Sequence, residues 1–341
     1  MSQGGPGHSA RGEGGTPVAH GGDLDQARAL FPGALEPWID LSTGINPVPY
    51  PCPPLDSSLF QRLPSAADHA ALRETAARAY GAPTAAGIVP APGTQILIET
   101  LPRLMAPCDV AVVGPTYAEH AAAWGRAGHT VRPVSDIAGV GDARVAVVVN
   151  PNNPDGRVRP AQALLALAET LQARGGFLVV DEAFADFEPV ESVCPQVGPG
   201  LVVLRSFGKT FGLAGLRLGF AVADSERAAA LAAALGPWAV SGPALAIGRA
   251  ALADRPWLAA NAAARAGDAA RLDRMIARAG GTLIGGTRLF RTAAFPDGPA
   301  LFRRLGEAGI YVRRFAERPS QLRFGLPADK GEWCRLSRML R

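Results

Sequence analysis

The chain has 341 residues, of which 48% are hydrophobic and 19% charged, and its formal net charge is +4 at pH 7. These values are ordinary for a globular protein long enough for one large and one smaller domain. The positive charge is spread along the chain without a long basic run, which argues against a nucleic-acid partner. No apolar run reaches the roughly 20 residues of a membrane span, so no membrane association is expected.

Residues 1–18 are rich in glycine and polar side chains and lack the apolar core of a signal peptide, so we expect a disordered leader. Residues 19–50 are expected to form an N-terminal arm, with a short helix over residues 23–31 behind a capping Asp23. Residues 38–54 contain five prolines and are expected to be irregular. The four cysteines are far apart without CxxC spacing, which predicts free thiols in a cytoplasmic protein and no metal site.

Residues 51–235 are expected to form the large domain. An amphipathic helix closed by Gly81 comes first, and apolar runs separated by helical segments follow. The runs lie within residues 87–105, 108–128, 143–157, 177–187, 200–209 and 218–224. This alternation predicts an α/β fold with a mainly parallel sheet that helices flank on both faces. Residues 236–341 begin in an Ala-rich helical segment and continue as an α+β pattern, which predicts a smaller C-terminal domain.

Ligands of an open parallel sheet bind beyond the carboxyl ends of its strands, so polar residues that follow apolar runs are the candidates for a site. Four such places stand out: Gly93-Thr94-Gln95, Asn153, Asp181, and the segment from Ser206 to Lys209.

The sequence Gly208-Lys209-Thr210 looks like the end of a nucleotide-binding loop. That loop needs a glycine five residues before Gly208, so that backbone amides can surround phosphates, and this position is Val203 within a strand. A phosphate-binding role for Lys209 is therefore set aside.

A lysine at a strand end with few acidic neighbours is suited to a Schiff base, and pyridoxal phosphate (PLP) is the cofactor that uses lysine in this way. The cofactor's ring nitrogen needs a buried carboxylate, for which Asp181 is the candidate, and its ring oxygen needs a donor, for which Asn153 is the candidate. Its phosphate needs amides at a helix start, hydroxyls and a guanidinium. The candidates for the phosphate are Gly93, Thr94, Gln95, Ser206 and Arg217.

The spacing of these residues supports the PLP interpretation. Asn153 and Asp181 are 28 residues apart, and so are Asp181 and Lys209. Each interval holds a helix and a strand, so the three groups recur at one sheet edge. Each residue alone also fits a turn, a helix cap or a solvated side chain, and only the combination favours a cofactor site.

The motifs NPNNPDG, DEAF and SFGKTFGLAGLRLGF resemble those of fold-type I PLP enzymes in the aminotransferase class I/II superfamily. The resemblance covers nearly all of the chain from His20 onward. It implies that Lys209 carries PLP covalently and that Tyr117 stacks on the cofactor ring. It also implies that Arg323 binds the substrate carboxylate, a task suited to a guanidinium.

Two groups of that superfamily are close: the histidinol-phosphate aminotransferases and the L-threonine-O-3-phosphate decarboxylases of cobalamin biosynthesis. The segments HGGDLDQA, IDLSTGINPVPYP and GPWAVSGPA look like the decarboxylases. Phe184 replaces the tyrosine usual in the aminotransferases, and Gly208 replaces a hydroxyl residue common in relatives. The Gly208 replacement puts one phosphate contact in doubt.

The resemblance implies decarboxylation of a small phosphorylated amino acid, and the substrate-phosphate candidates are His20, Asn46 and Arg313. A homodimer is expected, and a partner enzyme of the cobalamin pathway is an open alternative. Two other functions also stay open, an aminotransferase acting on histidinol phosphate and a non-catalytic binding protein that kept the fold.

Overall fold

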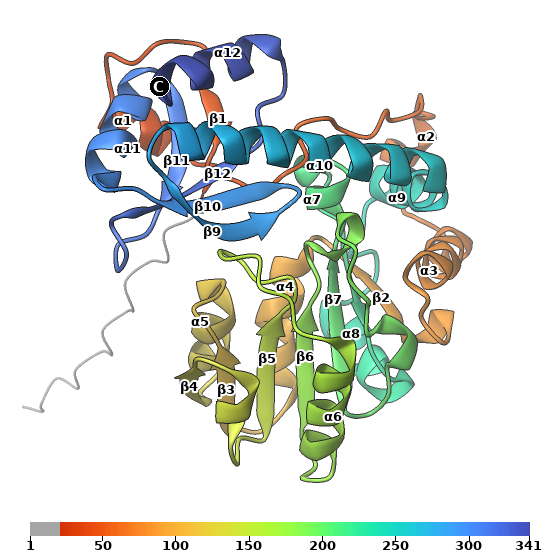
Figure 1. Ribbon diagram of the computed structural model, residues 1–341. Helices are drawn as coiled ribbons and strands as arrows, with labels where there is room; N and C mark the ends of the chain where they lie inside the picture. Colours follow the sequence, from red (N-terminus) through yellow and green to blue (C-terminus); the bar gives the residue numbers. More distant parts are fainter. Residues whose placement is uncertain (1–20) are drawn as a thin grey trace, which may run out of the picture.

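The computed structural model describes residues 21–341, and the chain forms two β-sheets with helices around them (Figure 1). The leader predicted over residues 1–18, and His20, lie outside the described residues. The larger sheet has seven strands in the order β2-β8-β7-β6-β5-β3-β4. Its strands are β2 (Ile88–Ala91), β3 (Asp109–Val113), β4 (Thr130–Val134), β5 (Val145–Val149), β6 (Phe177–Asp181), β7 (Leu201–Ser206) and β8 (Gly219–Val222).

All strands of this sheet except β8 run in one direction, so the prediction of a mainly parallel sheet is confirmed. Strand β8 is antiparallel to both β2 and β7. The link from β7 to β8 holds only the short helix α7 (Phe207–Thr210) and a 3-10 turn at Ala214–Leu216. A parallel crossover needs a long connection, usually a full helix, and this link is too compact to provide one.

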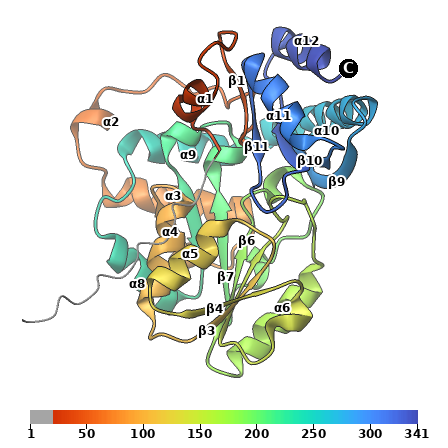
Figure 2. The same cartoon turned by 90° about the vertical axis from the view of Figure 1, so that its left-hand side faces the viewer.

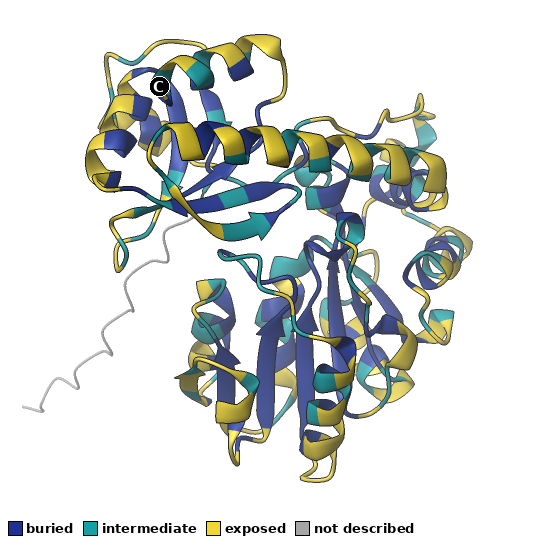
Figure 3. Cartoon of the chain, viewed as in Figure 1, coloured by how far each residue is buried: buried dark blue, intermediate teal, exposed yellow. Residues whose placement is uncertain are grey.

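Helices cover both faces of the large sheet. Its central strands are buried throughout, as their continuous Val and Leu runs predict (Figure 3). One face packs against α4 (Thr94–Thr100), α5 (Ala118–Arg126) and α8 (Ser225–Leu235). The other packs against α3 (Ala66–Tyr80), α6 (Ala161–Gln172) and α9 (Gly242–Ala253). The carboxyl edge of the sheet stays open between these layers.

Local sequence signals explain where α3 starts and ends. The Ser65 side chain accepts from the Asp68 amide while the Asp68 side chain accepts from the Ser65 amide, which satisfies two donors of the first turn. The helix ends at Gly81, whose φ of 69° lies in the left-handed region that favours glycine. A short helix α2 (Ser58–Gln61) precedes it.

The smaller sheet has the order β1-β11-β12-β10-β9. Its strands are β1 (Ile39–Leu41), β9 (Thr282–Thr287), β10 (Phe290–Ala294), β11 (Ile310–Arg314) and β12 (Gln321–Gly325). Around it lie α1 (Leu24–Leu30), α11 (Gly298–Glu307) and α12 (Lys330–Met339), with their own apolar core.

The expectation that residues 38–54 are irregular is wrong at their start, because Ile39–Leu41 form β1 and pair in parallel with β11. The apolar residues Ile39 and Leu41 enter the core of the smaller sheet, and this burial outweighs the prolines that follow. The N-terminal segment is thereby attached to the C-terminal part of the chain.

The long helix α10 (Arg255–Arg278) runs from the large-sheet part to the small-sheet part. It crosses above the large sheet in Figure 1 and lies at the right-hand side in Figure 2. Its N-terminal residue Trp257 stacks on Phe211, whose ring in turn stacks on Phe207 after β7. Within residues 21–341 no helix is long and apolar enough to cross a membrane. All four cysteines are free, as predicted.

Candidate active site

A cavity of about 1560 Å³ lies at the carboxyl edge of the large sheet, where the small sheet faces it. Its walls come from the ends of β5, β6 and β7 and from β11 and β12. It brings together eleven predicted site residues: Gly93, Thr94, Gln95, Tyr117, Asn153, Asp181, Ser206, Lys209, Arg217, Arg313 and Arg323. Residues that are far apart in the sequence therefore share one site.

Lys209 lies in α7, directly after β7, and its side chain forms part of the cavity wall. Burial, with the charges of Arg323 and Arg217, lowers the pKa of Lys209 from 10.5 to about 8, although Asp181 acts in the opposite direction. The Lys209 nitrogen lies 4.9 Å from the centre of the Phe184 ring. A substantial fraction of this amine is therefore neutral near physiological pH, as a nucleophile or proton-transfer group requires.

Asp181 is the last residue of β6, and its carboxylate is buried. One carboxylate oxygen, Oδ1, accepts from the Ala183 amide at 3.0 Å, and the other, Oδ2, lies 2.9 Å from Nε2 of His120. Because the carboxylate is an acceptor, the His120 ring donates this hydrogen bond. The two bonds hold the carboxylate in one orientation at the cavity wall.

Sequence reasoning missed His120. The residue lies in the first turn of α5, three positions after Tyr117, and it is 1% exposed. Residues three apart on a helix share a face, so Tyr117 already indicated that His120 points towards the sheet edge.

Arg323 in β12 is fixed by two hydrogen bonds. It donates through Nη1 to the side-chain oxygen of Asn153 and through Nη2 to the Ser42 carbonyl at 2.7 Å. Its Nε is buried and has no partner within residues 21–341. Burial and the nearby Arg313 lower the pKa of Arg323 to about 10. A cation held in one orientation at the cavity wall is suited to bind an anion.

The start of α4 forms a close approach between two segments. Gly93 has a φ of 85°, and a Cβ there would lie 2.6 Å from Nη2 of Arg217. A Cβ on Gly219 would lie 2.7 Å from the Thr94 amide nitrogen. Only glycine allows both approaches, and no side chain caps the helix. The free amides of the first turn, Arg217 and Ser206 together form a cradle suited to a phosphate.

The side chain of Gln95 turns towards Tyr117. Its Oε1 accepts from the Tyr117 hydroxyl at 3.2 Å, and its Nε2 donates to Glu119 at 3.3 Å. Burial and the Glu119 charge raise the pKa of Tyr117 to about 12, so the phenol stays protonated. The Gln95 side chain therefore fixes the Tyr117 ring, and only the Gln95 backbone amide is available to a phosphate.

The structure does not bring Asn46 into the cavity. This residue is 2% exposed, and its side chain donates to the Thr210 carbonyl at 2.9 Å and accepts from Arg265 at 3.3 Å. Asn46 instead connects the N-terminal segment to α7 and α10. No cluster of three or more potential metal-ligating side chains occurs in the described part of the chain.

Comparison of the chain with known proteins identifies its family. The family model of aminotransferase class I and II matches residues 39–332. The threonine-phosphate decarboxylase of Pseudomonas aeruginosa is 42% identical over 327 residues, which are 95% of this chain and 97% of the relative. The threonine-phosphate decarboxylase of a Sinorhizobium species is 45% identical over 320 residues, 92% of this chain and 94% of the relative.

A solved structure shares the fold. The histidinol-phosphate aminotransferase of Sinorhizobium meliloti, in complex with pyridoxal-5'-phosphate, matches with a TM-score of 0.77 at 23% identity, covering 96% of this chain and 94% of its own. The fold is that of the fold-type I PLP enzymes, as the motifs predicted. The chain belongs to the aminotransferase class I and II family.

Proposed function

We propose that the protein is a PLP-dependent carboxy-lyase that converts L-threonine O-3-phosphate to (R)-1-amino-2-propanol O-2-phosphate for cobalamin biosynthesis. The observation that carries this proposal is the 42% and 45% identity to two threonine-phosphate decarboxylases over more than nine tenths of each chain. The geometry of the cavity supports it, because the groups that the cofactor and an amino-acid carboxylate need all line this one cavity.

The described residues fit PLP on four counts. The buried carboxylate of Asp181 suits a protonated ring nitrogen, and the Lys209 amine suits the aldehyde. The cradle of Thr94, Ser206 and Arg217, which a Cβ at Gly93 would fill, suits the phosphate. Asn153 accepts from Arg323 through its oxygen, so its amide nitrogen would face the ring oxygen as a donor.

When bound, PLP supplies an electron sink for the charge left at the substrate Cα after carbon dioxide is lost. Arg323 lines the cavity and would bind the substrate carboxylate as a cation, and its bonds to Asn153 and Ser42 prevent the guanidinium from rotating. A cation held in this way would orient the substrate, and the orientation decides which of its bonds breaks. Tyr117, which also lines the cavity, would stack on the cofactor ring.

Lys209 returns a proton to the substrate Cα after decarboxylation. Its pKa of about 8 places the amine near the pH of operation, where proton transfer in both directions is efficient. The face of the Phe184 ring lies beside the amine and covers it on that side. The substrate phosphate is placed against Arg313, which lines the outer part of the cavity on β11.

We further propose a cytoplasmic homodimer. Three large apolar side chains near α2 and α9 support a subunit contact, since Phe60 is 69%, Leu63 68% and Trp238 54% exposed. Sedimentation should give twice the chain mass, and a monomer at micromolar concentration would contradict this. A partner enzyme of the cobalamin pathway remains a prediction, and co-purification with that enzyme tests it.

The decisive assay incubates the purified protein with PLP and threonine phosphate. We expect stoichiometric carbon dioxide and 1-amino-2-propanol phosphate, identified by mass, with no dependence on a 2-oxo acid. Formation of glutamate from 2-oxoglutarate, with histidinol phosphate as the amino donor, would favour the aminotransferase alternative instead. A protein that shows no PLP absorbance band would favour the non-catalytic alternative.

Arg323→Lys should raise KM for threonine phosphate by about 100-fold, because one ammonium replaces a guanidinium that makes several directed bonds. Steady-state carbon dioxide release measures this change. Arg278→Lys, in the last turn of α10 and outside the cavity lining, is the control with wild-type KM. An unchanged KM in Arg323→Lys would show that Arg323 does not bind the substrate carboxylate.

The titration of Lys209 should also appear in the stability of the apoprotein. The folded chain releases this proton near pH 8, whereas the unfolded chain holds it until pH 10.5. The unfolded chain therefore binds more protons between these values, so the free energy of unfolding rises with pH across this window. Urea unfolding should show a shallower rise for Lys209→Met than for the wild type, and equal slopes would contradict the lowered pKa.

A further inference from the structure

A second charged cluster lies directly behind the site, on the opposite face of the large sheet. It consists of Glu182, Asp186 and Arg205, whose side chains are 1%, 8% and 6% exposed. None of the three lines the cavity. The proposed reaction does not use them, although each is next to, or a few residues from, a residue that it does use.

The position of the cluster follows from strand alternation. Asp181 of β6 pairs in register with Leu204 of β7, and both point to the face that carries α4, α5 and α8. Successive residues of a strand point to opposite faces. Arg205 and Glu182 therefore point to the other face, behind Ser206 and Asp181.

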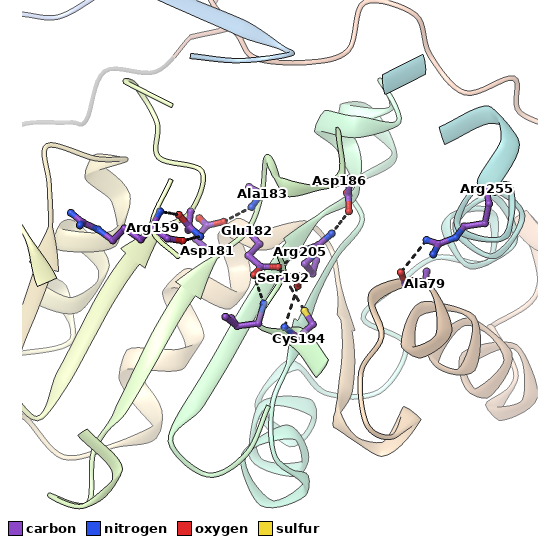
Figure 4. Close-up of polar contacts among 12 residues, drawn as sticks. Ala79, Arg159, Asp181, Glu182, Ala183, Asp186, Ser192, Cys194, Arg205 and Arg255 are labelled. Atoms are coloured by element: carbon purple, nitrogen blue, oxygen red, sulfur yellow. Dashed lines mark hydrogen bonds and ion pairs between the residues drawn. The ribbon is translucent and has the colours of Figure 1, made fainter. Parts of the chain in front are cut away.

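The contacts of Arg205 connect β7 with the end of β6 and with the turn that follows it (Figure 4). Its Nη1 donates to Glu182 at the end of β6, and its Nη2 donates to Asp186 in the 3-10 turn at Ala185–Phe187. Its guanidinium lies 4.6 Å from the centre of the Tyr80 ring on α3. Phe184, which faces the Lys209 amine, lies between the two carboxylates in the sequence.

Glu182 is held from the other side as well. Its Oε2 accepts from the Ser192 hydroxyl at 2.6 Å, and its Oε1 accepts from the Val193 amide at 2.9 Å. Its own amide donates to the Leu204 carbonyl at 2.9 Å. The carboxylate therefore cannot move without breaking several bonds, and it fixes Arg205 relative to β6.

The electrostatics support a permanent cluster. Burial by itself disfavours the charge of Arg205, but Asp186 and Glu182 outweigh it and raise the pKa of the guanidinium above its usual value. Two buried carboxylates share this one cation, so removal of the cation would leave both uncompensated in a water-poor environment. The loss of any one of these bonds would leave a buried charge unpaired and destabilise the fold. The three side chains are therefore held in one arrangement.

We propose that Arg205 is a positioning residue: by binding Glu182 and Asp186 it sets the separation between the carboxylate of Asp181 and the amine of Lys209. Both strand ends that carry the cofactor groups continue directly into this cluster. A shift of one end relative to the other would tilt the cofactor between its carboxylate and its lysine. The inference rests on the proposed function of the site.

The test uses Arg205→Lys in the full-length holoenzyme, because lysine keeps the charge and loses the two-armed geometry. We expect the Kd of PLP to rise about tenfold and kcat to fall about 100-fold, the scale of a displacement of about 1 Å at a reacting centre. The pH at which the absorbance band of bound PLP changes should also shift. Glu182→Gln, which keeps the size of the side chain, should give the same changes to a smaller degree.

The control is Asp273→Asn, which breaks a paired contact of similar type between α10 and β10, where Arg291 donates to Asp273 at 2.6 and 2.9 Å. Asp273→Asn should lower the melting temperature, but it should leave unchanged the Kd of PLP and the pH at which the absorbance band of bound PLP changes. If Arg205→Lys and Glu182→Gln behave like this control, the cluster is only structural and the inference is overturned. If the wild-type protein binds PLP but releases no carbon dioxide, only the proposed function is overturned. The Kd of PLP and the pH at which its absorbance band changes would still test the role of Arg205.

Discussion

Lys209→Ala should abolish carbon dioxide release, with kcat at least about 10⁴-fold below that of the wild type. The substitution removes both the covalent attachment of PLP and the amine whose pKa of about 8 suits proton return to the substrate. The absorbance band of bound PLP should disappear at the same time. Carbon dioxide release and the visible spectrum of the purified holoenzyme measure the two losses.

The chain offers a matched control, because Lys330 is its only other lysine. Lys330 starts α12 and is exposed, so Lys330→Ala should retain wild-type activity and spectrum. Borohydride reduction of the wild-type holoenzyme followed by peptide mass analysis should place the cofactor on the peptide that contains Lys209. A label on the Lys330 peptide, or none, would refute the assignment of the site.

Asp181→Asn should lower kcat by about 10³-fold, the scale of removing one preorganised electrostatic contact from an active site. Asparagine keeps the shape and the bond to the Ala183 amide, but it cannot stabilise a positive ring nitrogen, and its amide confronts the donor of His120. The cofactor would then withdraw electrons less well. Single-turnover carbon dioxide release separates this loss from a loss of substrate binding.

A chemical rescue makes this prediction specific. A PLP analogue methylated at the ring nitrogen carries a permanent positive charge, so it should restore part of the activity of Asp181→Asn and none of that of Lys209→Ala. Asp329→Asn, at the cap of α12, is the control and should match the wild type with natural PLP. If the analogue gives no gain in Asp181→Asn, the carboxylate acts on something other than the ring nitrogen.

The sequence by itself determined the fold class and the inner part of the site. Continuous apolar runs predict buried parallel strands, and the residue after each run lies at the carboxyl edge, because parallel strands all end there. For this reason Asp181 and Lys209 could be assigned before any coordinates, and both line the cavity. The direction of β8 could not be predicted, because an apolar run looks the same for a parallel and an antiparallel strand.

Only the tertiary structure decided what the long-range contacts are. The spacing to Tyr117 indicates the face on which His120 lies, but not its bond to Asp181. An arginine inside a strand, such as Arg205, gives no local signal of its partners. Asn46 was expected at the substrate, yet its side chain bonds to Thr210 and Arg265, which lie more than a hundred residues away. Hydrogen-bond partners of this kind depend on which segments the packed core brings together, and no periodicity in the sequence encodes that.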